Sequence, residues 1–472
     1  MNNKAINFMK NFSYTLMSNL VSLLVSVLMV LVVPKLLGTE DFGYWQLYLF
    51  YSSYVGFLHL GWNDGIYLRY GGNEYKDLNK RLFFSQFYML VIFQFIVAAI
   101  IFSTSIIFLA DENKAFIFQM TSLCLIITNL RFMLLFILQG TNRIKEYAMV
   151  TISGRILFCS LLIVFLVLGV REFKLLIVIE LIGRLLTFAF AIYYCKDIVF
   201  RKISTFYFSF REVTENISVG IKLMFANIAS MLIIGVVRFG IERSWDVSTF
   251  GKVSLTLSIS NLMMLFINAV GIILFPILRR TEKDKLPSIY ITMRDFLMIF
   301  LLGILIFYYP LKVVLSNWLP LYRESLMYLA LIFPISVYEG KMALLINTYL
   351  RTLRKEKQIL KINLLSLAIS IVVTFVTTVT FKNLDLAIFS IILILAIRSV
   401  LAEIFLSKVL EISLKRDLVL ESVIIFVFIL SGWFINSWLT LIIYLITYII
   451  YIYIKRGDIS KTILNLKLLL SR

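Results

Sequence analysis

The sequence predicts an all-helical protein that crosses a membrane many times. Hydrophobic types make up 61% of its 472 residues and charged types only 15%, against roughly 45–50% and about 25% in soluble domains. A soluble globule of this size would have to display much of that apolar surface. A soluble enzyme, a disordered chain and a secreted disulfide scaffold are therefore excluded.

Apolar stretches of about 20 residues, the length that a helix needs to cross a bilayer, recur along the whole chain. The chain has fourteen such stretches. Only Asn436 and Ser437, a predicted turn, separate the last two, so thirteen spans are the alternative. The expected spans are 12–34, 42–62, 83–109, 115–140, 148–169, 174–195, 218–240, 249–277, 288–310, 326–350, 359–381, 386–407, 418–435 and 438–454.

The distribution of the basic residues predicts the orientation. Most of the 46 Lys and Arg residues fall in alternate loops, and membrane proteins concentrate these residues on the cytoplasmic side. Both termini are therefore predicted to be cytoplasmic. This topology accounts for much of the net charge of +19, so no nucleic-acid partner is expected.

An internal repeat predicts the division into lobes. A shift of 208 residues superimposes polar positions and loop landmarks without a gap, and a repeat of six spans makes the two halves parallel. The predicted parts are a six-helix lobe over 1–210, a second over 211–417 and two further helices over 418–472. The matched pairs include Asn19 with Asn227, Ser22 with Ser230, and Phe42-Gly43 with Phe250-Gly251.

The sequence holds no sign of a cofactor or metal site. The three cysteines, Cys124, Cys159 and Cys195, lie in apolar runs without the spacing of a zinc or redox motif. We expect them to be small core residues.

Nine cations lie within the predicted spans, where topology does not explain them. A charge at the centre of a membrane helix costs about 2.5–3.5 kcal/mol on insertion scales, so each must face protein or water. Five of them lie near span ends, where their side chains can instead reach the membrane surface. The deepest four are Arg131, Arg184, Lys341 and Arg398, and the five near ends are Arg155, Lys222, Arg238, Lys252 and Arg294.

Acidic residues in the spans are fewer than these cations. Glu180 precedes Arg184 by four residues, which favours an ion pair on one helix face. Arg398 has only the badly placed Glu403 nearby, and Arg131 has Glu339, its repeat equivalent, as one possible partner across helices. The positive surplus suits a diphosphate, because guanidinium groups bind phosphate oxygens through paired donors.

Two segments resemble a known family. The stretch from Pro34 to Trp45 (PKLLGTEDFGYW) and the stretch from Leu60 to Gly65 (LGWNDG), followed by Arg69 and Tyr70, resemble bacterial Wzx-type polysaccharide flippases of the multidrug/oligosaccharidyl-lipid/polysaccharide superfamily. The resemblance implies a V-shaped pair of six-helix lobes in the bacterial cytoplasmic membrane.

In that family the chain would move undecaprenyl-diphosphate-linked oligosaccharides, such as O-antigen or capsule units, to the outer leaflet through a cationic central cavity. Membrane lipids, a polysaccharide polymerase and chain-length proteins are the further partners that fit the resemblance. The candidate substrate-contacting residues are Arg131, Arg184, Lys341, Arg398, Lys222, Arg238, Asn19 and Asn227. The candidates for coupling to a proton or sodium ion are Asp64, Glu180, Glu339 and His59, for which a structural ion pair or packing is the alternative.

Three other functions are weighed against this one. A membrane polymerase or glycosyltransferase is disfavoured because no predicted outer loop is long enough to enclose an active site. A multidrug exporter of organic cations is disfavoured by the positive surplus. An exporter of the peptidoglycan precursor remains an alternative, because its headgroup is also a diphosphate.

Overall fold

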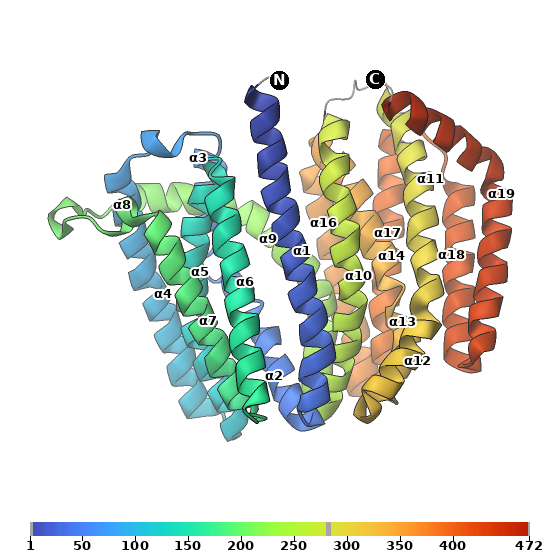
Figure 1. The fold of residues 1–472 in the computed structure, drawn as a ribbon, viewed down its shortest axis with the longest axis horizontal. Helices are drawn as coiled ribbons and strands as arrows, with labels where there is room; N and C mark the ends of the chain where they lie inside the picture. The colour runs from blue at the N-terminus through green and yellow to red at the C-terminus, as the bar shows by residue number, and fades with distance from the viewer. Residues whose placement is uncertain (1–2, 280–284, 471–472) are drawn as a thin grey trace. The chain divides into compact units, whose positions relative to one another are not determined.

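The computed structural model describes residues 3–279 and 285–470, and within them every regular element is a helix (Figure 1). Twelve helices among the described residues are long and apolar enough to cross a membrane. The predicted all-helical, multi-pass membrane protein is thereby confirmed. Of the fourteen expected spans, 42–62 and 249–277 are not among the twelve; the latter falls within the long helix α10, Val247–Arg279.

The chain folds into two compact units. Unit 1 comprises the chain up to Ile228 together with Val247–Gly251, and unit 2 comprises Ala229–Asp246 and the chain from Lys252 onward. The long helix α9, Phe210–Ser244, therefore contributes to both units. The lobe boundaries expected at residues 210 and 417 stay a prediction.

Unit 1 is built mainly on five long helices: α6 packs on α1 and α7, and α5 packs on α4 and α7 (Figure 1). Its helices are α1 (Asn3–Leu36), α2 (Thr39–Ser52), α3 (Trp62–Tyr70), α4 (Lys80–Phe108), α5 (Glu112–Gly140), α6 (Ile144–Val167), α7 (Phe173–Tyr194) and α8 (Lys196–Val199).

Unit 2 is built on α16 against α17, and on α11 against α19. Asn436 has a positive φ of 47° at the turn before the last helix, where the sequence predicted a turn. Its helices are α11 (Leu286–Ile304), α12 (Tyr308–Trp318), α13 (Leu329–Ile332), α14 (Ile335–Lys341), α15 (Asn347–Thr352), α16 (Glu356–Phe375), α17 (Leu384–Val409), α18 (Lys415–Leu430) and α19 (Trp438–Leu470).

The second expected span is not one continuous helix. Helix α2 ends at Ser52, and α3 begins only at Trp62. Between them Gly61 adopts a φ of 83°, and a Cβ atom there would lie 2.5 Å from the backbone nitrogen of Ile221 on α9. The continuous helix over 42–62 was therefore wrong, because the left-handed turn and the close approach of α9 both require an interruption at this glycine.

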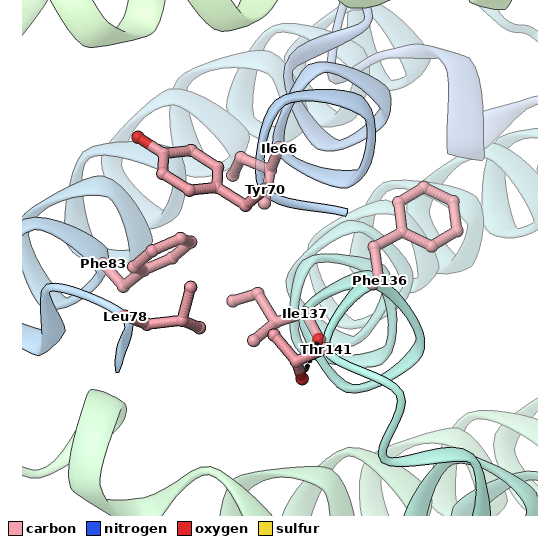
Figure 2. Close-up of a pocket in the computed structure, with 8 residues that line it drawn as sticks. Ile66, Tyr70, Leu78, Phe83, Phe136, Ile137 and Thr141 are labelled. Carbon is pink, nitrogen blue, oxygen red and sulfur yellow. Dashed lines mark hydrogen bonds between the residues drawn. The ribbon is translucent and has the colours of Figure 1, made fainter. Parts of the chain in front are cut away.

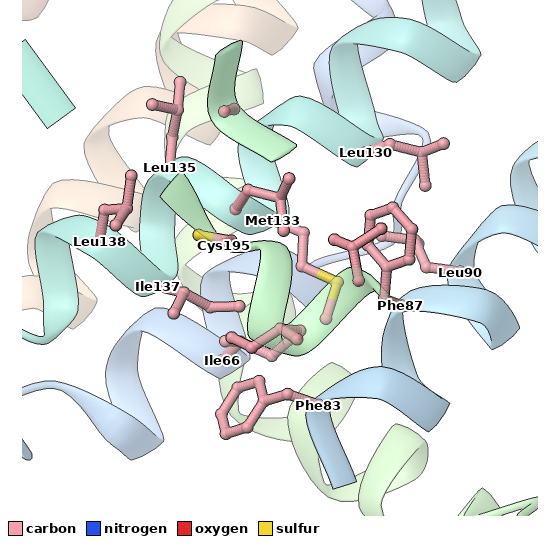
Figure 3. Close-up of a cluster of buried hydrophobic side chains, with 14 of the residues drawn as sticks. Ile66, Phe83, Phe87, Leu90, Leu130, Met133, Leu135, Ile137, Leu138 and Cys195 are labelled. Atoms are coloured by element: carbon pink, nitrogen blue, oxygen red, sulfur yellow. The ribbon is translucent and has the colours of Figure 1, made fainter. Parts of the chain in front are cut away.

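The apolar core of unit 1 holds α3, α4 and α5 together (Figure 3). Phe83, Phe87 and Leu90 of α4 lie in one buried cluster with Met133 and Leu138 of α5. Neighbouring helices are packed on both sides of α5, so most of its apolar residues face protein. Polar residues of α5, such as Thr128 and Asn129, are therefore also buried inside the unit.

Candidate functional site

Three arginines gather within unit 1, one on each of three packed helices. Arg131 lies on α5, Arg155 on α6 and Arg184 on α7, and all three are close enough to one another and to Glu180 to interact electrostatically. Arg155 and Arg184 each occupy the middle of their helix. We call these three arginines with Glu180 the unit 1 cluster.

Glu180 is the carboxylate of this cluster, and both of its oxygens are engaged. One oxygen forms an ion pair with Arg184, and the other accepts a hydrogen bond of 2.7 Å from the hydroxyl of Tyr48 on α2. Arg184 donates a second bond, of 2.9 Å, to Thr128 on α5. The pair of Glu180 with Arg184 that the four-residue spacing predicted is thus present.

The other two arginines are not neutralised in this way. Among the described residues neither Arg131 nor Arg155 forms an ion pair, and the Nε atom of Arg131 is buried without a hydrogen-bond partner. Arg155 is exposed on the surface of unit 1 and lies midway along α6 rather than at its end. The cluster therefore has three positive groups and one negative group.

Small residues bring α6 and α7 together at this point. A Cβ atom added to Gly154 would lie 2.7 Å from the hydroxyl of Thr187, and one added to Gly183 would lie 3.3 Å from Phe158. Small residues at a helix crossing allow close backbone approach within membranes. Gly154 and Gly183 are the neighbours of Arg155 and Arg184 in sequence, so the crossing positions both guanidinium groups.

Arg398 of unit 2 has a complete set of partners. It forms an ion pair of 2.6 Å with Glu339 on α14, and it donates hydrogen bonds of 3.0 Å to Asn363 on α16 and 2.9 Å to Ser230 on α9. The side chain is 2% exposed. The badly placed Glu403 is not its partner; Glu339 reaches Arg398 from another helix.

Lys341 belongs to a second, more deeply buried group of charges in unit 2. Its ammonium lies 2.6 Å from Glu403 on α17 and 3.1 Å from Glu421 on α18. Arg294 on α11 lies 2.5 Å from Glu403 and 2.7 Å from Glu421, and Tyr290 donates to Glu403 at 3.2 Å. Arg294 is 0% exposed, so it does not extend to the membrane surface.

The group continues to the last helix. Lys455 on α19 lies 2.9 Å from Asp295 on α11 and 3.0 Å from both Asp417 on α18 and Asp458. The ion pairs therefore join α18 and α19 to α11, α14 and α17. Glu421 and Lys455 were not among the site residues predicted from the sequence, although Glu421 is a carboxylate within an apolar run.

The remaining substrate candidates are more dispersed. Lys222 and Asn227 are exposed on α9, and Asn19 is partly exposed on α1. Arg238 donates a hydrogen bond of 3.0 Å to Ser254 on α10. The described contacts join none of Asn19, Lys222 and Asn227 to the unit 1 cluster.

His59 and Asp64 lie at the break between α2 and α3. His59 is 3% exposed, its Nδ1 atom accepts a hydrogen bond of 3.0 Å from the backbone of Gly61, and its Nε2 atom lies 3.7 Å from Asp64. Asp64 lies in the first turn of α3, where the helix dipole favours a negative charge. Glu180, by contrast, lies in the unit 1 cluster and Glu339 beside Arg398.

A network of buried amides stabilises the same break and was missed from sequence. Asn129 donates to Gln94 at 2.7 Å and to the backbone oxygen of Val55 at 3.0 Å, and Asn63 donates to the backbone oxygen of Asn129 at 2.9 Å. Gln94 donates at 3.3 Å to the backbone oxygen of Leu58. These amides replace backbone hydrogen bonds that the interrupted helix cannot make.

A polar cluster outside the membrane-spanning helices joins α8 to the start of α4. The hydroxyl of Tyr75 donates to Asp197 at 2.6 Å, and Lys80 lies 3.3 Å from the same carboxylate. Partial burial opposes ionisation of Asp197, but the bond from Tyr75 and the charge of Lys80 outweigh it and lower the pKa of this carboxyl below its usual value.

A small pocket in unit 1 is a poor candidate for a headgroup site. It is lined mainly by Ile66, Tyr70, Leu78, Phe83 and Ile137, and Figure 2 shows that apolar groups surround most of it. It has essentially no room for a water molecule, whereas sites for small molecules usually measure roughly 300–1,000 Å³. We interpret it as a packing gap.

The fold is shared with solved transporters. No sequence-family profile matches the chain, and no curated protein matches it in sequence. A lipid II flippase, MurJ, in an inward closed conformation is similar with a TM-score of 0.66 at 13% identity, over 94% of this chain and 99% of that one.

Two further structures show the same similarity. An inward-facing multidrug resistance MATE family transporter of the MOP superfamily gives a TM-score of 0.62 at 12% identity, over 84% of this chain and 95% of that one. A MOP superfamily transporter from Pyrococcus furiosus gives 0.51 at 12% identity, over 85% and 96%. The chain therefore has the fold of MOP superfamily transporters.

Proposed function

We propose that the protein is a flippase that moves undecaprenyl-diphosphate-linked oligosaccharides from the inner to the outer leaflet of a bacterial cytoplasmic membrane by alternating access. The observation that supports this function is the positive surplus of the unit 1 cluster. Three guanidinium groups, Arg131, Arg155 and Arg184, share the single carboxylate of Glu180.

A positive surplus in a membrane-spanning region has a cost that must be balanced. Charges held in the bilayer are unfavourable unless they are paired or hydrated. A diphosphate supplies negative charge and several acceptor oxygens, and guanidinium groups bind such oxygens through parallel donors. The free donors of Arg131 and Arg155 suit such a ligand.

The same charge argues against export of organic cations, because three guanidinium groups repel a positive ligand. It does not separate an oligosaccharide-diphosphate lipid from the peptidoglycan precursor. The similarity to a lipid II flippase concerns the fold and does not choose between these two substrates. We therefore keep the peptidoglycan precursor as the second candidate substrate. A polysaccharide polymerase gains no support from a fold shared with transporters.

A leaflet-exchange assay tests the proposal. The purified chain is placed in liposomes with a fluorescent undecaprenyl-diphosphate oligosaccharide, and an impermeant quencher reports which leaflet holds the lipid. We expect exchange to be accelerated by the wild type and slowed about tenfold or more in R131A, R155A and R184A, because a lost bond to a charged group costs about 1.5–3 kcal/mol. R323A, which removes an exposed arginine, is the matched control.

Parallel liposomes decide between the substrates. Faster exchange of lipid II than of the oligosaccharide lipid would favour the precursor, and uptake of ethidium would favour a multidrug exporter. No exchange of either lipid under a proton or sodium gradient would refute the flippase proposal.

A further inference from the structure

We infer that Glu180 is a resident counter-ion that the substrate's diphosphate displaces from Arg184, and that the displaced carboxylate then binds one proton. Substrate and proton would therefore bind together to the unit 1 cluster. This inference rests on the proposed function, because it couples proton binding to substrate binding at the same site.

Glu180 and an incoming diphosphate would compete for Arg184. The guanidinium of Arg184 is the only cation that forms an ion pair with Glu180 among the described residues. The carboxylate occupies the place that a phosphate oxygen would take on this guanidinium. A diphosphate that enters finds Arg131 and Arg155 without a carboxylate, but it must compete with Glu180 for Arg184.

Glu180 is buried among few groups that could bind a proton. Glu180 is 8% exposed, so a released carboxylate has little water to solvate it. The titratable and charged groups on the packed helices are Tyr48 on α2, Cys124 and Arg131 on α5, Arg155 on α6 and Arg184 on α7. Glu180 is the only acidic side chain among them, so the proton that compensates an incoming negative charge has one carboxylate to bind.

Binding of a diphosphate would add negative charge next to Glu180. In the empty cluster the carboxylate is paired with Arg184. When the diphosphate takes over Arg184, the ion pair of Glu180 breaks and two negative groups lie close together with little water between them. Burial and a like charge both favour the neutral form of a carboxylic acid. A proton from solution neutralises the group, and the hydroxyl of Tyr48 still donates to its carbonyl oxygen.

The inference has a quantitative consequence. If one proton binds with each diphosphate, the apparent affinity should rise about tenfold for each unit by which the pH falls, over the range in which the proton is taken up. A cluster of three arginines without a displaceable carboxylate would show no such dependence on Glu180.

Isothermal titration calorimetry of the full-length protein in nanodiscs provides the test. Farnesyl diphosphate is the probe, and binding is measured at pH 8 in two buffers of different ionisation enthalpy, with empty nanodiscs as the blank. At this pH the diphosphate is ionised, so protons taken up must go to the protein. We expect about one proton per bound probe for the wild type.

Two variants locate the proton. E180Q should bind the probe at least as tightly as the wild type but without proton uptake, because the amide neither competes for Arg184 nor titrates. E146Q is the matched control, since Glu146 of the same unit pairs with Arg143 outside the cluster, and it should keep the uptake of the wild type.

The outcomes separate the two proposals. Binding without proton uptake by the wild type, or uptake that persists in E180Q, would overturn the coupling inference and leave the flippase proposal standing. No binding of the probe by a folded wild type would overturn the diphosphate site and the coupling inference together. The wild-type result stands by itself if E180Q fails to fold.

Discussion

In unit 1 three guanidinium groups share one carboxylate, whereas in unit 2 Arg294, Lys341 and Arg398 each lie within 2.6 Å of a carboxylate oxygen. The two units therefore differ in how far carboxylates neutralise their basic side chains. In unit 2 the charges hold helices to one another. In unit 1 the Nε atom of Arg131 is buried without a hydrogen-bond partner, as the proposed diphosphate site requires.

The repeat predicted from the sequence makes the contrast sharper. The shift of 208 residues relates Arg131 to Glu339 and Arg155 to Asn363. In unit 2 these two equivalents are partners of a single arginine, Arg398. In unit 1 the same positions are cations. At these two positions unit 2 therefore has the polar partners of an arginine, whereas unit 1 has arginines.

The largest expected effect is on the buried network of unit 2. E403A removes a carboxylate that contacts both Arg294 and Lys341, so each cation loses one of the two carboxylates that they share. Breaking a buried pair by removing one member typically costs about 3–5 kcal/mol. We expect a strongly lowered Tm in detergent, or no folded protein. E356A, at an exposed glutamate, should leave the Tm unchanged; a similar loss in both variants would contradict a structural role for the network.

A double-mutant cycle measures the next effect. R398A and E339A should each lower stability because each leaves the other group without its ion-pair partner. The double variant should lose less than the sum, by a coupling energy of about 0.5–3 kcal/mol. Thermal unfolding of the four proteins gives this energy. Additive losses would show that the pair of 2.6 Å contributes nothing.

The opposite sign is expected in unit 1. R131Q removes one of three mutually repelling cations, so the Tm should stay the same or rise, while lipid exchange falls. R398Q in unit 2 should instead lower the Tm. The comparison between the units would fail if R131Q were as destabilised as R398Q in the same unfolding assay.

The smallest effect concerns pH. The lowered pKa of Asp197 means that its contribution to stability is present above the pKa of an unfolded aspartate, about 3.9, and is lost as the pH falls through the lower folded value. Between pH 5 and 8 this cluster should therefore contribute a constant amount. D197N should lower the Tm by the same small amount at both pH values. A difference that changes between pH 5 and pH 8 would contradict this sign.

Local signals predicted the parts of the site that lie on one helix. The four-residue spacing of Glu180 and Arg184 predicted their ion pair, which the structure contains. Spacing along one chain segment determines which side chains share a helix face. The same rule made Arg398 look unpartnered, since its nearest acid in sequence was badly placed. Its partner, Glu339, is 59 residues away.

The interrupted second span shows another limit. Apolar composition over 42–62 predicted one helix, but the backbone turns at Gly61 against Ile221 of α9. Hydropathy reports the environment of side chains and not the path of the backbone. The buried amides of Asn63, Gln94 and Asn129 were the available signal, because amides in an apolar run satisfy irregular backbone.

The sequence by itself determined that this is a helical, multi-pass membrane protein with more buried cations than nearby acids, because composition, span length and charge distribution are properties of the chain. Only the tertiary structure decided which cations are neutralised. Glu403 and Glu421 reach Arg294 and Lys341 across packed helices, while Arg131 and Arg155 receive no carboxylate among the described residues. Ion pairs depend on distances of a few ångströms, and helix packing sets those distances.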